Sequence, residues 1–181
     1  MSSVNVDIHA AISKSVERLE ISYVLENRSS EDVYILDALF RMEHGAIVLD
    51  PSLAYTIVEN DLLVLFRGVV RIPHGIQVEI PEMPLARLLK AGQKAKGEII
   101  SPLPLHYHNP YHWPEGEKTL YTRRICVRIG YVPAGGIQAP PQARKVNSTN
   151  LYRLSYREVV EGQNFSETGI QATDVHILQQ P

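Results

Sequence analysis

Three histidines within seven residues, His106, His108 and His112, form the pattern best suited to chemistry in this sequence. Neutral imidazole nitrogens bind transition metals, and alternate residues of an extended segment point to the same side, so His106 and His108 can reach one ion. The pattern therefore allows a metal-binding enzyme or sensor, completed by a distant carboxylate or by His74. In the alternative interpretation, these histidines pack on the edge of the fold and hydrogen-bond its backbone.

Aromatic side chains in the same stretch suggest a different function, the binding of a protein partner. Tyr107, Tyr111 and Trp113, the only tryptophan of the chain, lie among four prolines between residues 101 and 116. Tyrosine and tryptophan provide contact area at low entropic cost and are enriched at binding surfaces. Because each proline fixes φ and removes a backbone donor, we expect a long loop here, and long loops are often functional.

Arginines give a third candidate surface. Arg124 and Arg128 share one face of a predicted strand, and Arg153 and Arg157 share one face of a later strand. If these strands are neighbours, their guanidinium groups project from one sheet and can meet an acidic partner, including the acidic half of a second copy. The alternative is a solvated sheet face with carboxylates nearby.

Motifs for other kinds of catalysis are missing from the sequence. No serine lies in a Gly-x-Ser-x-Gly elbow, and no His-Glu-x-x-His pair is present. Cys126 is expected in the middle of a strand without a base beside it, and the glycines of residues 130–136 lack the spacing of a phosphate-binding turn. The sequence therefore predicts no catalytic residue, and no cofactor apart from the metal considered above.

Alternation of apolar and polar residues predicts β-strands as the elements that position these side chains. Residues 19–26 and 33–42 alternate on either side of a polar turn and are expected to form an antiparallel pair. Residues 62–70 are apolar on both faces, which is typical of a central strand covered by a second sheet.

Later segments are predicted as strands separated by loops. Residues 84–91 have a proline early and a glycine just after, so they fit either a short helix or a strand that ends in a turn at 90–93. Further strands are expected at residues 95–100, 119–132, 151–156 and 170–178, with a loop from 133 to about 150.

Composition favours one globular domain that spans residues 1–181. Hydrophobic residues make up 44% and charged residues 21%, which is ordinary globular usage. We expect a cytoplasmic protein, because the N-terminal residues lack a secretory pattern, no long apolar segment spans a membrane, and a single cysteine excludes an internal disulfide. The halves differ in net charge, which is −5 for residues 1–90 and +3 for residues 91–181. A charge of +3 is too small to indicate binding of nucleic acid.

The succession of short strands predicts an all-β fold, a two-layer antiparallel immunoglobulin-like β-sandwich, with a closed barrel as the rival architecture. Residues 25–34 (Leu-Glu-Asn-Arg-Ser-Ser-Glu-Asp-Val-Tyr) resemble the strand, Asn turn and strand that open immunoglobulin-like and fibronectin type III-like domains. Residues 89–93 (Leu-Lys-Ala-Gly-Gln) resemble their Leu-x-x-Gly-x turn. Bacterial intracellular proteinase-inhibitor domains share both features in this order, which implies protease inhibition as one function.

His106-Tyr-His108 also resembles the start of a cupin metal site. The resemblance departs where cupins have a carboxylate, since His112 and then Glu115 follow here, and the expected glycine is displaced to Gly97. The function we expect is therefore a non-catalytic protein-binding or assembly module that presents the 101–116 loop or an edge strand to a partner or to its own copy. A cupin-like metalloprotein and a protease inhibitor remain the alternatives.

Overall fold

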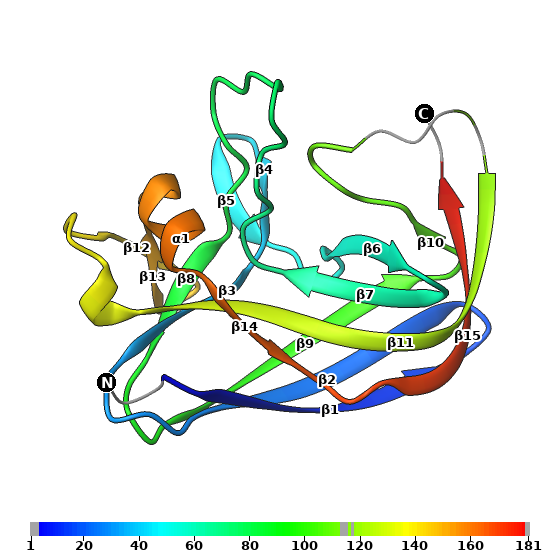
Figure 1. The fold of residues 1–181 in the computed structure, drawn as a ribbon, viewed down its shortest axis with the longest axis horizontal. Helices are drawn as coiled ribbons and strands as arrows, with labels where there is room; N and C mark the ends of the chain where they lie inside the picture. Colours follow the sequence, from blue (N-terminus) through cyan, green and yellow to red (C-terminus); the bar gives the residue numbers. More distant parts are fainter. Residues whose placement is uncertain (1–3, 113–115, 117, 180–181) are drawn as a thin grey trace.

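The structure is a computed structural model that describes residues 4–112, 116 and 118–179. It is all-β, and its sheets stack as a β-sandwich (Figure 1). The first sheet is antiparallel, in the order β1-β2-β9, with β1 at Val6–Lys14, β2 at Arg18–Asn27 and β9 at Lys94–Pro102. The predicted fold class is confirmed at the level of an all-β sandwich.

The second sheet is larger and follows the order β10-β15-β11-β3-β8-β13-β12. Strand β14 also pairs with β11, and β6 joins the sheet through β7, which runs parallel to β11. The strands are β3 (Val33–Ala38), β6 (Tyr55–Glu59), β7 (Leu62–Arg67), β8 (Leu85–Leu89), β10 (Leu105–His106), β11 (Lys118–Pro133), β12 (Gln142–Val146), β13 (Thr149–Arg153), β14 (Asn164–Glu167) and β15 (Gln171–Gln179). A separate hairpin consists of β4 (Phe40–Glu43) and β5 (Ala46–Leu49).

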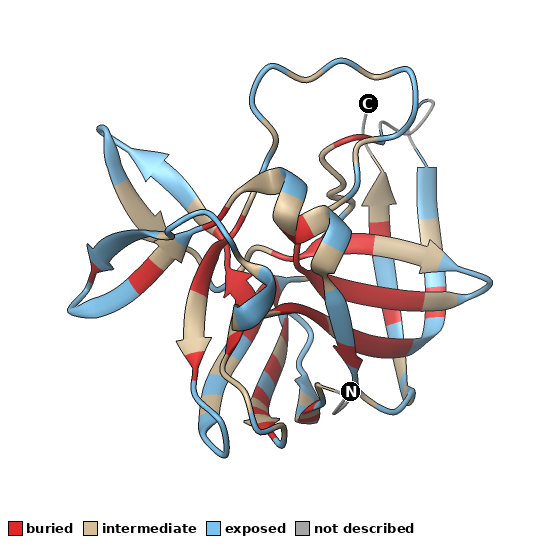
Figure 2. Cartoon of the chain, turned by 60° about the vertical axis from the view of Figure 1, so that its left-hand side comes forward, coloured by how far each residue is buried: buried red, intermediate tan, exposed pale blue. Residues whose placement is uncertain are grey.

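The main core lies between the two sheets. Alternate residues of each strand point inward, so β2 contributes Leu19, Ile21 and Leu25 from one side while β11 contributes Ile125 and Val127 from the other, all fully buried. Figure 2 shows these buried stretches along the strands. The predicted central strand at residues 62–70 is confirmed at Leu62–Arg67, where β7 is buried on both faces.

Two strands that were expected to pair belong to different sheets. β2 pairs with β1 and β9, whereas β3 pairs with β11 and β8, so the predicted antiparallel pair of residues 19–26 and 33–42 is wrong. The side chain of Asn27 explains the crossover. It is buried, donates to the carbonyls of Glu31 (2.8 Å) and Leu89 (3.1 Å), and accepts from the backbone N–H of Ser29 (3.1 Å). This fixes a turn that carries the chain from one sheet to the other.

The short helix also lies elsewhere than one prediction placed it. Residues 84–91 contain strand β8, as in the alternative, while the α-helix of the described chain, α1, is at Tyr156–Gly162. The predicted strand at 151–156 is β13, which ends at Arg153, and the predicted loop at 133–150 contains a 3₁₀ turn (Ala134–Gly136) and β12. The Gln163 side chain stabilises the end of the helix by bonding the backbone N–H (2.8 Å) and C=O (3.0 Å) of Val69.

A buried polar network connects the sheets. The Asp37 carboxylate accepts hydrogen bonds from the Tyr23 hydroxyl (2.8 Å) and from the Arg87 guanidinium (Nε, 2.9 Å). Arg67, itself buried, donates to the Tyr23 oxygen (3.1 Å) and to the carbonyl of Pro51 (2.9 Å). Burial raises the pKa of Tyr23, and the Asp37 charge raises it further. The network thus keeps Tyr23 protonated and links β2 with β3, β7 and β8.

Candidate binding site

The predicted histidine site does not form a metal-ligand cluster among the described residues. His106 is exposed at the end of β10, His108 packs edge-on against Tyr55 with ring centroids 5.2 Å apart, and His112 packs on Tyr107 at 5.9 Å. Within residues 4–112, 116 and 118–179, no group of three or more His, Cys, Asp or Glu side chains is placed to hold a metal ion. The metal site stays a prediction from the sequence.

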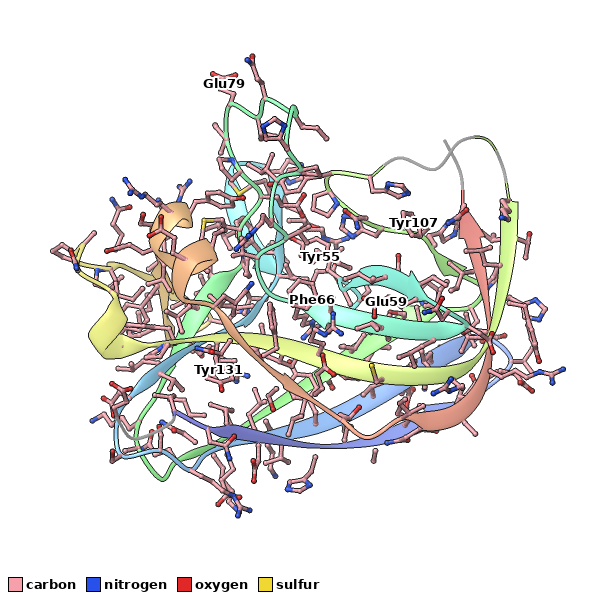
Figure 3. All side chains as sticks on the ribbon, viewed as in Figure 1. Tyr55, Glu59, Phe66, Glu79, Tyr107 and Tyr131 are labelled. Carbon is pink, nitrogen blue, oxygen red and sulfur yellow. The ribbon has the colours of Figure 1, made fainter. Side chains whose placement is uncertain are left out.

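Residues 107–111 are bound to the body of the protein. The backbone N–H of Thr56 donates to the His108 carbonyl (2.7 Å), and the N–H of His108 donates to the Thr56 hydroxyl (2.6 Å). Tyr111 is buried, and its hydroxyl accepts the N–H of Glu82 (2.9 Å). Tyr55 and Tyr107 lie on the same side of the sandwich in Figure 3. Trp113, the third aromatic candidate, lies outside the described residues.

The four candidate arginines do not share one sheet face. Arg124 and Arg128 lie on β11, and Arg128 forms an ion pair with Glu167 of β14. Arg153 ends β13, which pairs with β8 and β12 rather than with β11. Arg157 lies on α1 and pairs with Glu161 at 3.1 Å, so the expectation that Arg153 and Arg157 share a strand is wrong.

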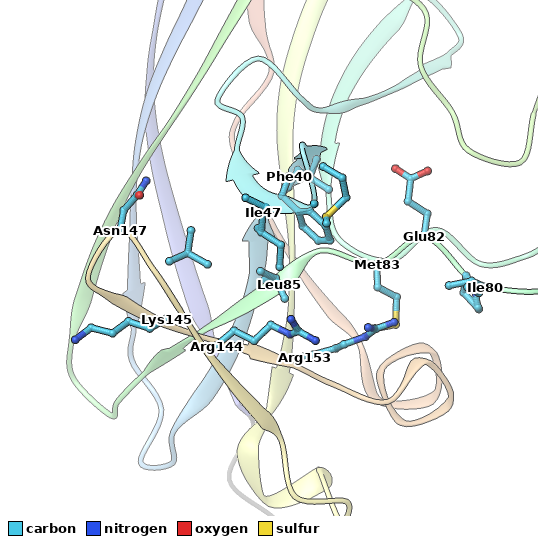
Figure 4. Close-up of a pocket in the computed structure, with 16 residues that line it drawn as sticks. Phe40, Ile47, Ile80, Glu82, Met83, Leu85, Arg144, Lys145, Asn147 and Arg153 are labelled. Carbon is cyan, nitrogen blue, oxygen red and sulfur yellow. The ribbon is translucent and has the colours of Figure 1, made fainter.

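A groove brings together residues that the sequence keeps far apart. It has a volume of about 880 Å³ and lies between the β4–β5 hairpin, residues 80–85 and the β12–β13 hairpin (Figure 4). Its apolar lining comes from all three segments and includes Phe40, Met42, Ile47, Ile80, Met83 and Leu85. We call it the hairpin groove.

Tight turns explain why the two hairpins form. Both central residues of each turn have positive φ, His44 (50°) with Gly45 (81°) and Asn147 (47°) with Ser148 (66°). This is the type I′ pattern, whose twist matches that of the flanking strands. In the first hairpin the register sets Met42 opposite Ile47, so both side chains point to the same face and line the groove.

The walls of the hairpin groove expose large apolar side chains. Met42 is 59% exposed and Ile80 is 70% exposed. Exposure of these side chains is unfavourable, because transfer of apolar surface from water to a protein interior lowers the free energy. Met42 and Met83 are two of the three methionines of the chain, and the flexible thioether adapts to varied apolar surfaces. Exposed apolar walls of this kind mark a surface suited to a partner.

The charge of the groove is positive. The side chains of Arg144 and Arg153 lie on the groove face of the β12–β13 hairpin, whereas that of Lys145 points away from it (Figure 4). Neither Arg144 nor Arg153 forms an ion pair with a described residue. Glu82 is the one carboxylate among the lining residues, and it accepts a hydrogen bond from the Tyr55 hydroxyl (3.0 Å). Burial raises the pKa of Tyr55, and the nearby Glu82 charge raises it further, so this hydroxyl stays a donor. The groove thus carries more positive than negative side chains beside its apolar wall.

Sequence reasoning missed the groove, apart from Arg153. The other members lie at residues 39–47, 80–85 and 144–147, and no spacing in the sequence relates these segments. One indication was available: residues 142–145 are polar or small on both faces and include two adjacent cations. Such a segment does not fit a half-buried strand.

No family model, curated protein or solved structure matches this chain. No helix among the described residues is long and apolar enough to cross a membrane.

Proposed function

We propose that this protein is a non-catalytic binding module that holds an acidic, apolar segment of a protein partner in the hairpin groove. The observation that carries the proposal is the combination of exposed apolar walls at Met42 and Ile80 with two cations, Arg144 and Arg153, that lack an ion-pair partner among the described residues. Opposite charge at the rim directs encounter and selects the partner, while apolar contacts supply most of the affinity.

The buried cysteine supports a binding role over nucleophilic catalysis. Cys126 lies in a cluster with Val64 and Phe66, and burial raises the pKa of its thiol. A protonated buried thiol is a poor nucleophile.

An immunoglobulin-like identity is part of the proposal. In an immunoglobulin-like fold, the strands A, B, C, C′, E, F and G follow one another along the chain and form the sheets A-B-E and G-F-C-C′. If β1, β2, β3, β8, β9, β11 and β15 take these names in chain order, the observed orders β1-β2-β9 and β15-β11-β3-β8 are the same two sheets. In this scheme the segment from β4 to β7 is an insertion between C and C′, and the segment from β12 to β14 is an insertion between F and G. Each hairpin of the groove then belongs to an insertion, while the frame positions them.

A peptide-selection experiment tests the proposed function. Random peptides displayed on phage are selected on the full chain, and the tightest binder is measured by fluorescence polarisation against wild type, Arg144→Glu/Arg153→Glu and Ile47→Asp. We expect acidic peptides with large apolar residues, and affinity reduced about tenfold or more by either variant. The matched control is Lys118→Glu/Arg123→Glu, which reverses two exposed charges on β11.

The proposal fails if the selected peptides bind the groove variants and the wild type equally. It fails also if selection yields no peptide whose binding depends on acidic residues. Circular dichroism of each variant confirms that a loss of binding is not a loss of fold.

A further inference from the structure

The outer edge of β12 is free of backbone partners in the described chain. β12 is the last strand in the order of the large sheet and pairs only with β13. None of the backbone hydrogen bonds outside the ladders involves Gln142–Val146. A strand edge of this kind presents a row of N–H and C=O groups that can template another strand.

The register of the hairpin identifies which groups point outward. In a two-residue type I′ hairpin, the pair that flanks the turn, Val146 and Thr149, exchanges hydrogen bonds. Because hydrogen-bonded and non-hydrogen-bonded pairs alternate, Arg144 bonds to Leu151, whereas Ala143 and Lys145 direct their N–H and C=O groups away from β13. Two donors and two acceptors therefore face solvent along this edge.

Two other strand edges in the described part of the chain carry hydrogen bonds. Thr56 of β6 bonds to His108 through its backbone and side chain, and the side chain of Gln171 donates to the Ala10 carbonyl of β1 (3.3 Å). The β4–β5 hairpin also borders the groove and pairs only within itself, but its Arg41 forms ion pairs with Glu43 (2.8 Å) and Asp50 (3.4 Å). β12 differs in carrying two cations, Arg144 and Lys145, that have no ion-pair partner among the described residues.

We infer that the partner segment binds as an extended strand that adds to the outer edge of β12. This inference rests on the proposed function and specifies its binding mode. Backbone bonds form with Ala143 and Lys145, and every second side chain of the segment enters the groove on the face that carries Arg144 and Val146.

Charge on β12 selects the sequence of the added strand. Arg144 points to the groove face and Lys145 to the opposite face, because side chains alternate along a strand. An added strand therefore meets a cation on each face, which favours acidic residues on both. The same cations repel basic strands, and edge lysines are known to suppress unselective pairing.

Two substitutions at one position separate backbone from side-chain recognition. Lys145→Pro removes the outward N–H without removing a bond of the β12–β13 ladder, whereas Lys145→Ala removes only the side chain. With the acidic peptide selected on the groove as probe, we expect the proline variant to bind about fivefold to tenfold more weakly than the alanine variant.

A measurement on the wild-type protein tests the inference even if the proline variant does not fold. Amide hydrogen exchange followed by NMR is expected to slow at Ala143 and Lys145 when the peptide saturates the protein, and to stay unchanged at Arg144, which is already bonded. If the two Lys145 variants bind the peptide equally and exchange at Ala143 and Lys145 is unchanged, the partner does not bind as an added strand. In that case a loss of affinity in Arg144→Glu/Arg153→Glu would still support binding in the groove. If charge reversal has no effect, the proposed function itself has failed.

Discussion

Replacement of Asp37 by asparagine gives the sharpest test of the buried polar network. The Asp37 carboxylate is 4% exposed and accepts bonds from Tyr23 (2.8 Å) and from two nitrogens of Arg87 (Nε, 2.9 Å). Asn keeps the shape but turns one acceptor into a donor that faces another donor, and it leaves the Arg87 charge without its partner. Removing one member of a buried ion pair costs about 3–5 kcal/mol.

The expected value lies near the lower end of that range. The Arg87 side chain is 25% exposed, so water compensates part of its lost partner, and its Nη1 keeps a bond to the Lys96 carbonyl (2.9 Å). We therefore expect Asp37→Asn to lower the free energy of unfolding by about 3 kcal/mol. Urea unfolding at neutral pH measures it as a shift of the midpoint at unchanged slope.

The matched control is Asp7→Asn, which breaks an exposed pair with Arg28 at 2.8 Å. Exposed pairs contribute less than about 1 kcal/mol. A second variant, Asp37→Asn/Arg87→Met, should be more stable than the sum of the single changes allows, because no unpaired guanidinium remains. If Asp37→Asn costs no more than Asp7→Asn, the network does not hold the sheets together as argued.

Three further outcomes follow from the described contacts. Gly97→Ala should destabilise the fold by about 1–3 kcal/mol in thermal or urea unfolding, since a Cβ there would overlap the Tyr23 ring, whereas Gly136→Ala, with open space around it, should not; equal stability of the two would contradict the close approach. Stability should decline above pH 10.0, because burial raises the pKa of Tyr23 and Tyr55 above that ordinary value and the folded state then retains protons that the unfolded chain releases. Tyr23→Phe should flatten this decline in pH-dependent urea titrations, and an unchanged slope would show that Tyr23 does not contribute. Elemental analysis of untagged protein should give equal transition-metal content for wild type and His106→Ala/His108→Ala; one equivalent that is lost in the variant would support the metal site predicted from the sequence.

Several strands of the frame were predictable because they are half buried or fully buried, whereas β1 was not predicted and β8 was left open between a helix and a strand. β2, β11 and β15 show the apolar periodicity that a strand between solvent and core requires, and β7 shows the apolar run of a covered strand. Which strands pair was not predictable. The crossover after β2 depends on the bonds of Asn27 to Glu31 and Leu89, and the second of these residues is distant in the sequence.

The helix and the groove escaped prediction for related reasons. Val159 and Val160 favour strand by intrinsic propensity, but Val159 is fully buried in a cluster with Leu36 and Val132, and this tertiary packing outweighs local preference. The groove depends on two hairpins that meet across the fold. β12 is polar or small on both faces and lacks the alternation by which strands are recognised, whereas β4 does alternate but nothing in the sequence places it beside β12. Its site residues therefore became visible only when the fold placed the hairpins beside each other.

Strand β11 pairs with four others: β3, β7, β14 and β15. During synthesis the chain emerges from the ribosome from its N-terminus, so β3 and β7 leave the exit tunnel well before the strand that joins them. The antiparallel sheet of β1, β2 and β9 can close first, whereas the larger sheet cannot form until Pro133 has emerged. Until then the nascent chain exposes the edges of β3 and β7 that β11 later covers, and unpaired strand edges of this kind are prone to aggregation.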